Sequence, residues 1–161
     1  MSFFVWLENT AISEWIRTSP SLWGFPFILY LHTLGLALIA GLSSAVALWI
    51  LVLPAQRDRS SLLKLFPLMW TGLAINGLSG IALLITYPAK AMTNPVFYIK
   101  LAAIAGACGI VYWLQNRFAA SILHLQRAAW GLLGLWLVAT LTGRLLAYTH
   151  SILMASSVLN F

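Results

Sequence analysis

The chain has 161 residues, of which 61% are hydrophobic and only 7% are charged, and its formal net charge is +6. A soluble domain carries about 25% charged residues, so this composition excludes a chain that is surrounded by water. In a bilayer the backbone must satisfy its own hydrogen bonds, and long apolar runs without alternation favour helices over a β-barrel. The sequence therefore predicts an all-α integral membrane protein, a four-transmembrane-helix bundle with an N-terminal interfacial amphipathic helix.

The N-terminal segment, residues 1–20, mixes aromatic and aliphatic residues with charged ones. Trp6 and Trp15 stand close to Glu8, Glu14 and Arg17. This mixture is typical of one or two short helices that lie in the membrane interface. Because no basic residue precedes Glu8, we do not expect a cleaved signal peptide.

The remainder, residues 21–161, forms the transmembrane domain. Its four apolar runs each exceed the ~20 residues that a spanning helix needs. They cover residues 23–53, 62–87, 95–116 and 128–155. Gly72, Asn76 and Gly80 share one face of the second run, which indicates a close contact with a neighbouring helix.

The basic residues predict the orientation. Arg57, Arg59 and Lys64 lie in the first connection, and Arg117 and Arg127 lie in the third. Basic residues in short loops favour the cytoplasmic side, so we expect a multi-pass protein of the bacterial inner (cytoplasmic) membrane with both termini periplasmic. No basic stripe carries interleaved aromatic residues on a soluble face, so a nucleic-acid partner is not expected.

Four basic residues lie at membrane depth, where ionisable groups are costly and usually functional: His32, Lys100, Arg144 and His150. At 1.5 Å per residue, His32 and His150 lie roughly 32 and 35 Å from the cytoplasmic ends of their helices, and Lys100 and Arg144 roughly 24 and 26 Å. All four therefore belong to the outer half of the bundle, with the two histidines at matched depth.

The two histidines suggest a cofactor. A haem b needs one imidazole from each of two facing helices, so His32 and His150 are candidate ligands of a haem iron. Gly35 and Gly143 would leave room for a porphyrin beside them, and a basic side chain would pair with a propionate. A quinone site could use the same donors, which are His32, Lys100 and Arg144. Alternatively, His32 makes an interhelical hydrogen bond, His150 lies in the wet interface, and Lys100 extends its ammonium to the headgroups.

Four stretches of the sequence carry a resemblance. They are the run Trp23-Gly-Phe-Pro-Phe-Ile-Leu-Tyr-Leu-His32-Thr-Leu-Gly35-Leu-Ala-Leu, the pair Thr71-Gly72, the run Asn94-Pro95-Val-Phe97-Tyr-Ile-Lys100-Leu, and the run Gly143-Arg144-Leu-Leu-Ala-Tyr148. From about Glu8 to Tyr148 the chain resembles an uncharacterised bacterial family of small four-span membrane proteins, catalogued as a domain of unknown function. A weaker likeness is to copper-resistance D-type membrane proteins. The resemblance implies a four-span fold and brings no activity with it, but it draws attention to His32, Lys100 and Arg144.

Motifs of self-contained enzymes are missing from the sequence. It has no phosphate-binding glycine loop and no HExxH or CxxC spacing, and its predicted spans hold no carboxylate for a proton relay. We therefore do not expect an enzyme on its own or a solitary transporter.

Three classes of function remain. The first is a membrane subunit of a larger respiratory or dehydrogenase-type complex, with cytochrome-b-like electron transfer through a haem b or quinone site near the periplasmic face. The second is a non-catalytic structural or assembly subunit of a membrane complex. The third is a copper-handling membrane protein, although four methionines and three histidines are few for copper. In each class the partners are the lipid bilayer and, for the first two, other subunits.

Overall fold

The computed structural model of the chain describes residues 6, 9–52, 60–86, 88–117 and 121–158, and it describes only the backbone of residues 60, 61, 89, 90 and 147–158. Within these ranges every regular element is helical. Four helical segments are long and apolar enough to cross a membrane: Phe25–Val52, Phe66–Thr86, Pro95–Asn116 and Ile122–Leu146. The predicted all-α bundle of four transmembrane helices is confirmed.

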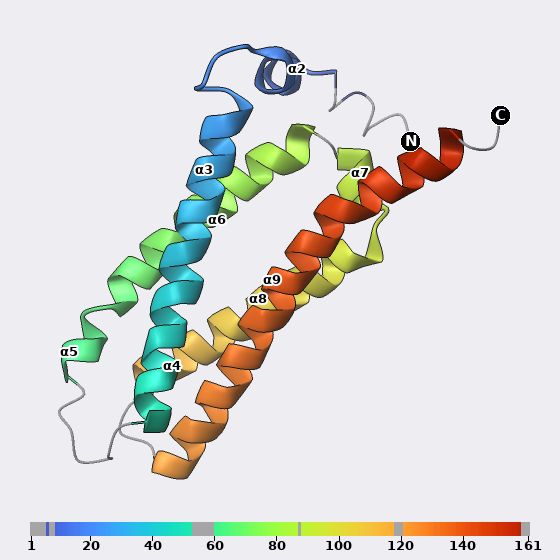
Figure 1. The fold of residues 1–161 in the computed structure, drawn as a ribbon. Helices are drawn as coiled ribbons and strands as arrows, with labels where there is room; N and C mark the ends of the chain where they lie inside the picture. Colours follow the sequence, from blue (N-terminus) through green and yellow to red (C-terminus); the bar gives the residue numbers. More distant parts are fainter. Residues whose placement is uncertain (1–5, 7–8, 53–59, 87, 118–120, 159–161) are drawn as a thin grey trace.

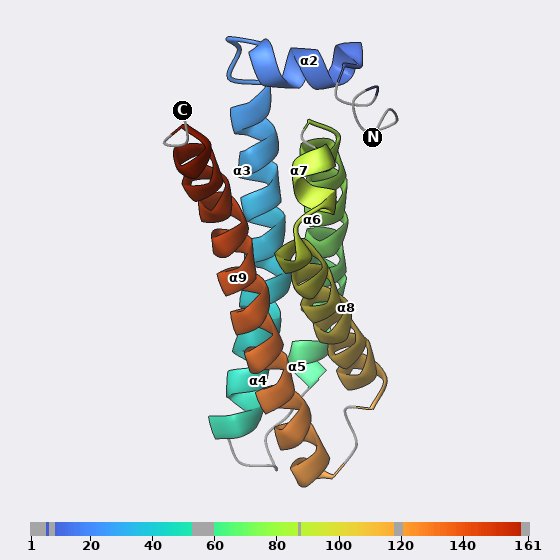
Figure 2. The same ribbon diagram turned by 90° about the vertical axis from the view of Figure 1, so that its right-hand side faces the viewer.

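The N-terminal amphipathic helix is α2, Ala11–Thr18. Thr10 caps it, because its hydroxyl oxygen accepts a hydrogen bond from the Ser13 backbone N–H at 3.4 Å. Ser13 and Ile16 are buried, and the Ser13 hydroxyl donates to the Ile85 carbonyl at 3.3 Å. The helix therefore lies across the end of the bundle and is docked on the second span (Figures 1 and 2). Helix predicted before Trp6 lies outside the described residues.

The first span is continuous but changes its winding. It consists of α3, Phe25–Leu36, a π-helical turn η1, Ala37–Gly41, and α4, Leu42–Val52. Pro26 stands in the first turn of α3, where its missing N–H costs nothing. Such π turns are rare and are found mostly as single turns within α-helices, often near functional sites.

The second and third spans have sharper ends than the sequence showed. A short helix α5, Ser60–Leu63, precedes α6, Phe66–Thr86, and a short α7, Pro88–Met92, precedes α8, Pro95–Asn116. Asn94 caps α8, since its side-chain oxygen accepts from the Val96 N–H at 3.0 Å. The third span was predicted at about residues 95–116, close to these bounds of α8.

The last helix, α9, is longer than predicted. It runs over Ile122–Val158, or 37 residues, and its part with described side chains, Ile122–Leu146, is long and apolar enough to cross a membrane. The prediction placed its start at residue 128, but no proline or glycine between Ile122 and Ala128 stops the helix from starting earlier. At 1.5 Å per residue α9 measures about 55 Å, well beyond the ~30 Å of hydrocarbon, so one end extends past the bilayer core.

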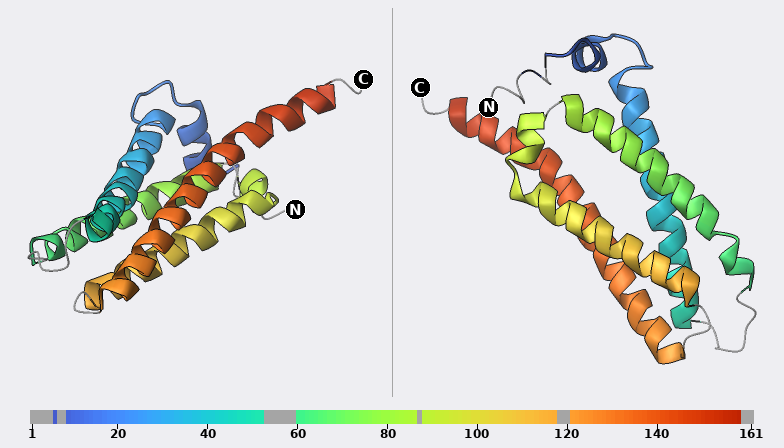
Figure 3. Two further views of the ribbon diagram at one scale, coloured as in Figure 1. Left: turned by 60° about the horizontal axis from the view of Figure 1, so that its bottom comes forward. Right: turned by 180° about the vertical axis from the view of Figure 1, so that it is seen from behind.

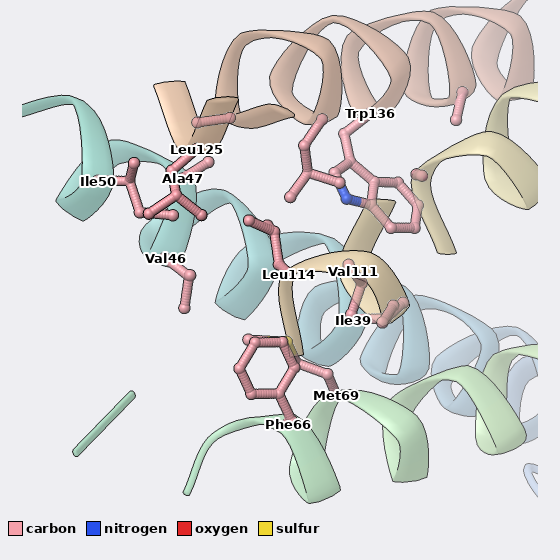
Figure 4. Close-up of a cluster of buried hydrophobic side chains, with 14 of the residues drawn as sticks. Ile39, Val46, Ala47, Ile50, Phe66, Met69, Val111, Leu114, Leu125 and Trp136 are labelled. Carbon is pink, nitrogen blue, oxygen red and sulfur yellow. The ribbon is translucent and has the colours of Figure 1, made fainter. Parts of the chain in front are cut away.

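The helices pack as two pairs. The most extensive contacts join α8 to α9 and α3 to α6, and α4 joins the pairs by packing on α9. The buried core lies where the pairs meet (Figure 4). Its residues include Ile39, Val46, Phe66, Met69, Val111, Leu114, Leu132 and Trp136. Toward the end that carries α2 and α7, the α3–α6 pair and the α8–α9 pair diverge (Figures 1 and 3).

Two tryptophan N–H groups connect helices, one within this core and one at an exposed position. Trp136 is buried, and its Nε1 donates to the Ser43 hydroxyl at 2.8 Å, which links α9 to α4. The Trp70 Nε1 donates to the Gln115 side-chain oxygen at 2.8 Å, which links α6 to α8. Both indoles therefore act as interhelical donors.

Candidate functional site

His32 lies on α3 and faces α6. Its Nδ1 is 3.1 Å from the Asn76 carbonyl oxygen and 3.2 Å from the Ser79 hydroxyl oxygen. A carbonyl can only accept, so this geometry assigns the imidazole proton to Nδ1, from which it donates to Asn76. The Ser79 hydroxyl donates to backbone carbonyls of its own helix, at 2.6 Å for Ile75 and 3.1 Å for Asn76. In the neutral imidazole the lone pair then belongs to Nε2, which makes no hydrogen bond to the described residues.

Asn76 returns the contact from α6 to α3. Its side-chain Nδ2 donates to the His32 carbonyl at 2.7 Å, and the residue is buried. The two residues therefore bond to each other's backbone carbonyls. In an apolar medium such a pair holds both the position of the two helices and the rotation of the imidazole ring.

Glycines allow this close approach. A Cβ added to Gly35 would lie 2.5 Å from the Asn76 backbone nitrogen, and one added to Gly72 would lie 2.5 Å from the Leu38 Cβ. Gly80 leaves room for the ring itself, since a Cβ there would lie 3.2 Å from the His32 Cε1. The helix face predicted from Gly72, Asn76 and Gly80 is the face that packs on α3.

The expectation for Gly35 needs correction. The sequence suggested that Gly35 leaves space for a porphyrin beside His32. The structure fills that space with the backbone of α6, at Gly72 and Asn76. The small size of Gly35 therefore serves the contact between two helices, because backbone atoms packed at this distance leave no room for a further group.

Lys100 approaches the site from the other helix pair. It is partly buried on α8, and its Cε and Nζ lie 3.8 and 3.9 Å from the Cβ position of Gly143 on α9. The lysine stem therefore passes over α9 at Gly143, at ordinary van der Waals distance from a Cβ there. The Lys100 ammonium is also near enough to His32 to act on the imidazole electrostatically. The structure therefore brings Lys100 of α8 against Gly143 of α9, within electrostatic range of His32 on α3.

The other two predicted site residues have different outcomes. The Arg144 side chain is exposed on the surface of the bundle, and its role as a donor to a cofactor stays a prediction. His150 belongs to α9, but its side chain lies outside the described residues, and its pairing with His32 stays a prediction. Within the described part of the chain no group of three or more His, Cys, Asp or Glu side chains could hold a metal ion.

An apolar groove adjoins the polar cluster. It has a volume of about 310 Å³ between α3 and α6 and is lined by Ile28, Leu31, Ile75, Leu78, Ser79 and Ala82. Ser79 is its polar member and also contacts His32. Sequence reasoning missed Ser79, although its position three residues after Asn76 places it on the same face of the helix.

Comparison with protein-family models, with curated proteins and with solved structures finds no match to this chain. The function is therefore inferred from the fold and from the geometry of the site.

Proposed function

We propose that the chain is a subunit of a respiratory or dehydrogenase-type complex in the bacterial inner membrane, and that His32 and Lys100 hold a quinol headgroup near the periplasmic face. One observation carries this proposal. The Asn76 carbonyl accepts the Nδ1–H of His32, so Nε2 keeps its lone pair on a partly buried ring within electrostatic range of Lys100. A ring held in this way presents one defined hydrogen-bond acceptor to a ligand.

The chemistry of quinol oxidation suits these two groups. A quinol must lose two protons and two electrons to become a quinone. Nε2 of His32 would accept the proton of one hydroxyl, and the second hydroxyl would release its proton to water at the periplasmic face. The Lys100 ammonium would donate a hydrogen bond to the oxygen that this second proton leaves. The electrons would pass one at a time to a redox centre of a partner subunit. The groove beside Ser79 would receive the first part of the apolar tail.

The test uses the intact complex in native membranes. His32→Ala should lower quinol-dependent electron flow by about 10²-fold or more, the lower end of what a positioned proton acceptor contributes. Thr33→Ala is the control, because Thr33 follows His32 on α3 but is exposed and donates its hydroxyl proton to the Leu29 carbonyl of the same helix. Immunoblots of the assembled complex separate loss of activity from loss of assembly. Unchanged electron flow in an assembled His32→Ala complex would rule the quinol site out.

A haem b is the second candidate, and the same imidazole geometry favours it. An axial histidine also needs its Nδ1–H engaged and its Nε2 free. With His150 as the other ligand, the purified complex should show a reduced-minus-oxidised haem spectrum that either His32→Ala or His150→Ala abolishes. A gently purified complex without pigment would exclude the haem. If both cofactor tests fail, the conclusion is a structural or assembly subunit, in which His32 serves the α3–α6 contact.

A further inference from the structure

A second groove lies at the opposite end of the bundle, between α8 and α9. It has a volume of about 290 Å³ and is lined by Gly106, Gly109, Ile110, Trp113, His124 and Ala128. A Cβ added to Gly109 would meet no atom within 4 Å, so the missing side chain at this position keeps the groove open. The groove is exposed on the outer face of the α8–α9 pair.

The groove runs along the helices from their ends toward the middle of the membrane. Gly106 and Trp113 are seven residues apart on α8, which is about 10 Å along the axis. Trp113 lies one turn before the end of α8, and His124 lies in the first turn of α9. One end of the groove is therefore at the headgroup level, where tryptophan is typical, and the other is among the acyl chains.

The mouth of this groove is basic. Arg117 follows Trp113 by one turn, Arg127 directly precedes Ala128, and both side chains are exposed. His124 lines the mouth itself, with its Nδ1 2.6 Å from the Ser121 hydroxyl oxygen. Among the described residues the one acid is Glu14, on α2 at the far end of the bundle. The charge at this mouth is therefore complementary to an anion.

We propose that this groove binds one acyl chain of an anionic phospholipid, with the lipid phosphate at Arg117, Arg127 and His124. The shape and the charge support the same occupant. A narrow apolar channel that begins at a cationic mouth matches the lipid's own order of charged head and apolar chain. Arginine side chains near an anionic leaflet each contribute roughly 1 kcal/mol to attraction, or about fivefold in affinity.

The test measures lipid retention by native mass spectrometry on the delipidated full-length chain in detergent. The probes are dioleoyl phosphatidylglycerol and dioleoyl phosphatidylcholine, which share the same acyl chains. Phosphatidylglycerol should be retained in preference. Gly109→Leu should lower retention of both lipids because it fills the groove. Gly134→Leu is the matched control, since Gly134 is also exposed and free of neighbours but lies outside the groove.

Charge variants test the mouth separately and leave the helix packing unchanged. Arg117→Gln and Arg127→Gln should each lower phosphatidylglycerol retention about fivefold. Lys64→Gln, an exposed residue beside α5, should not. If Gly109→Leu does not fold, the two arginine variants test the proposal by themselves. Equal retention of the two lipids, an equal loss with Lys64→Gln, or a wild-type result with a folded Gly109→Leu would overturn the proposal. A dimer that Gly109→Leu dissociates would assign the groove to a second copy instead.

Discussion

At the residue scale, the role of His32 depends on three neighbours on another helix. The Asn76 carbonyl accepts a hydrogen bond from the His32 Nδ1–H, and the Asn76 amide donates one to the His32 carbonyl. The Ser79 hydroxyl oxygen lies 3.2 Å from Nδ1, and Gly80 leaves space for the ring. Depth alone had marked His32 as a candidate ligand or an interhelical hydrogen bond. The structure shows the interhelical bond at Nδ1, and this bond leaves Nε2 available, so the two interpretations are compatible.

Asn76→Leu should destabilise the bundle by about 1 kcal/mol. The reason is that the substitution removes the 2.7 Å hydrogen bond to the His32 carbonyl, and interhelical bonds in membranes contribute about 0.6–2 kcal/mol. Unfolding in mixed detergent and dodecyl sulfate micelles measures the change. Asn116→Leu is the control, because Asn116 is exposed and its amide donates to the Tyr112 carbonyl within α8. Equal effects of the two variants would show that the Asn76 bond contributes nothing specific.

Ser43 and Trp136 should be energetically coupled. The Trp136 N–H is buried and donates to Ser43 at 2.8 Å, so Ser43→Ala leaves an unpaired donor in the core. A double-mutant cycle of Ser43→Ala with Trp136→Phe should give a coupling energy of about 1 kcal/mol. The same unfolding assay reports it. A cycle of Thr33→Val with Trp136→Phe should give none, since Thr33 is exposed and bonds within its own helix.

At the scale of elements, the contact of α3 with α6 depends on two glycines. Gly35 and Gly72 bring backbone against backbone, and the π turn η1 begins two residues after Gly35. Small residues let helices approach in lipid, where apolar side chains gain little by leaving the solvent. The contact therefore positions His32, because α6 supplies every hydrogen bond that the imidazole makes with described residues.

Gly35→Ala should lower the stability of the bundle by about 1–3 kcal/mol, the usual cost of overpacking. The new methyl group would lie 2.5 Å from the Asn76 nitrogen, and a helix backbone cannot move aside as a side chain can. Gly77→Ala, on an open face of α6, should instead leave stability unchanged or raise it by up to about 1 kcal/mol. Thermal unfolding of both variants in detergent checks this opposite sign, and a loss in both would contradict it.

At the scale of the whole molecule, the two helix pairs meet tightly at one end and diverge at the other. The core and the α4–α9 contact lie at the first end, while His32 and Lys100 lie toward the second. α2 and the C-terminal part of α9 share this second end (Figure 2). An even number of spans puts both ends of the chain on the same side of the membrane. Which side this is follows only from the basic residues of the connections.

The C-terminus should therefore be periplasmic. A reporter that is active only in the cytoplasm should be inactive when fused after Phe161. The same reporter inserted in the connection between α8 and α9 should be active, because Arg117 and Arg127 flank that connection. Activity in cells measures both fusions side by side. The reverse pattern would place His32 and Lys100 at the cytoplasmic face and would exclude a periplasmic quinol site.

The sequence by itself determined that the chain lies in a lipid bilayer, how many helices span it, and roughly where most of these helices begin and end. Hydrophobic length and proline positions report directly on these features: the third span was predicted at about residues 95–116, and α8 covers Pro95–Asn116. The prediction began α9 near residue 128, but the helix begins at Ile122. It missed this first part because nothing in residues 122–127 distinguishes a helix from a connecting loop. The depths of His32 and Lys100 in the membrane follow from the helical rise alone and stay predictions.

Only the tertiary structure decided which residues meet. The rotation of α3 against α6 turned Gly35 into a packing contact, and the path of Lys100 over Gly143 depends on how α8 crosses α9. Arg144 follows Gly143 on α9 but is exposed, because successive residues on a helix point about 100° apart. Apolar helices of similar composition can be rotated or shifted without changing their hydropathy. The partners of each polar side chain therefore depend on backbone contacts that no local pattern encodes.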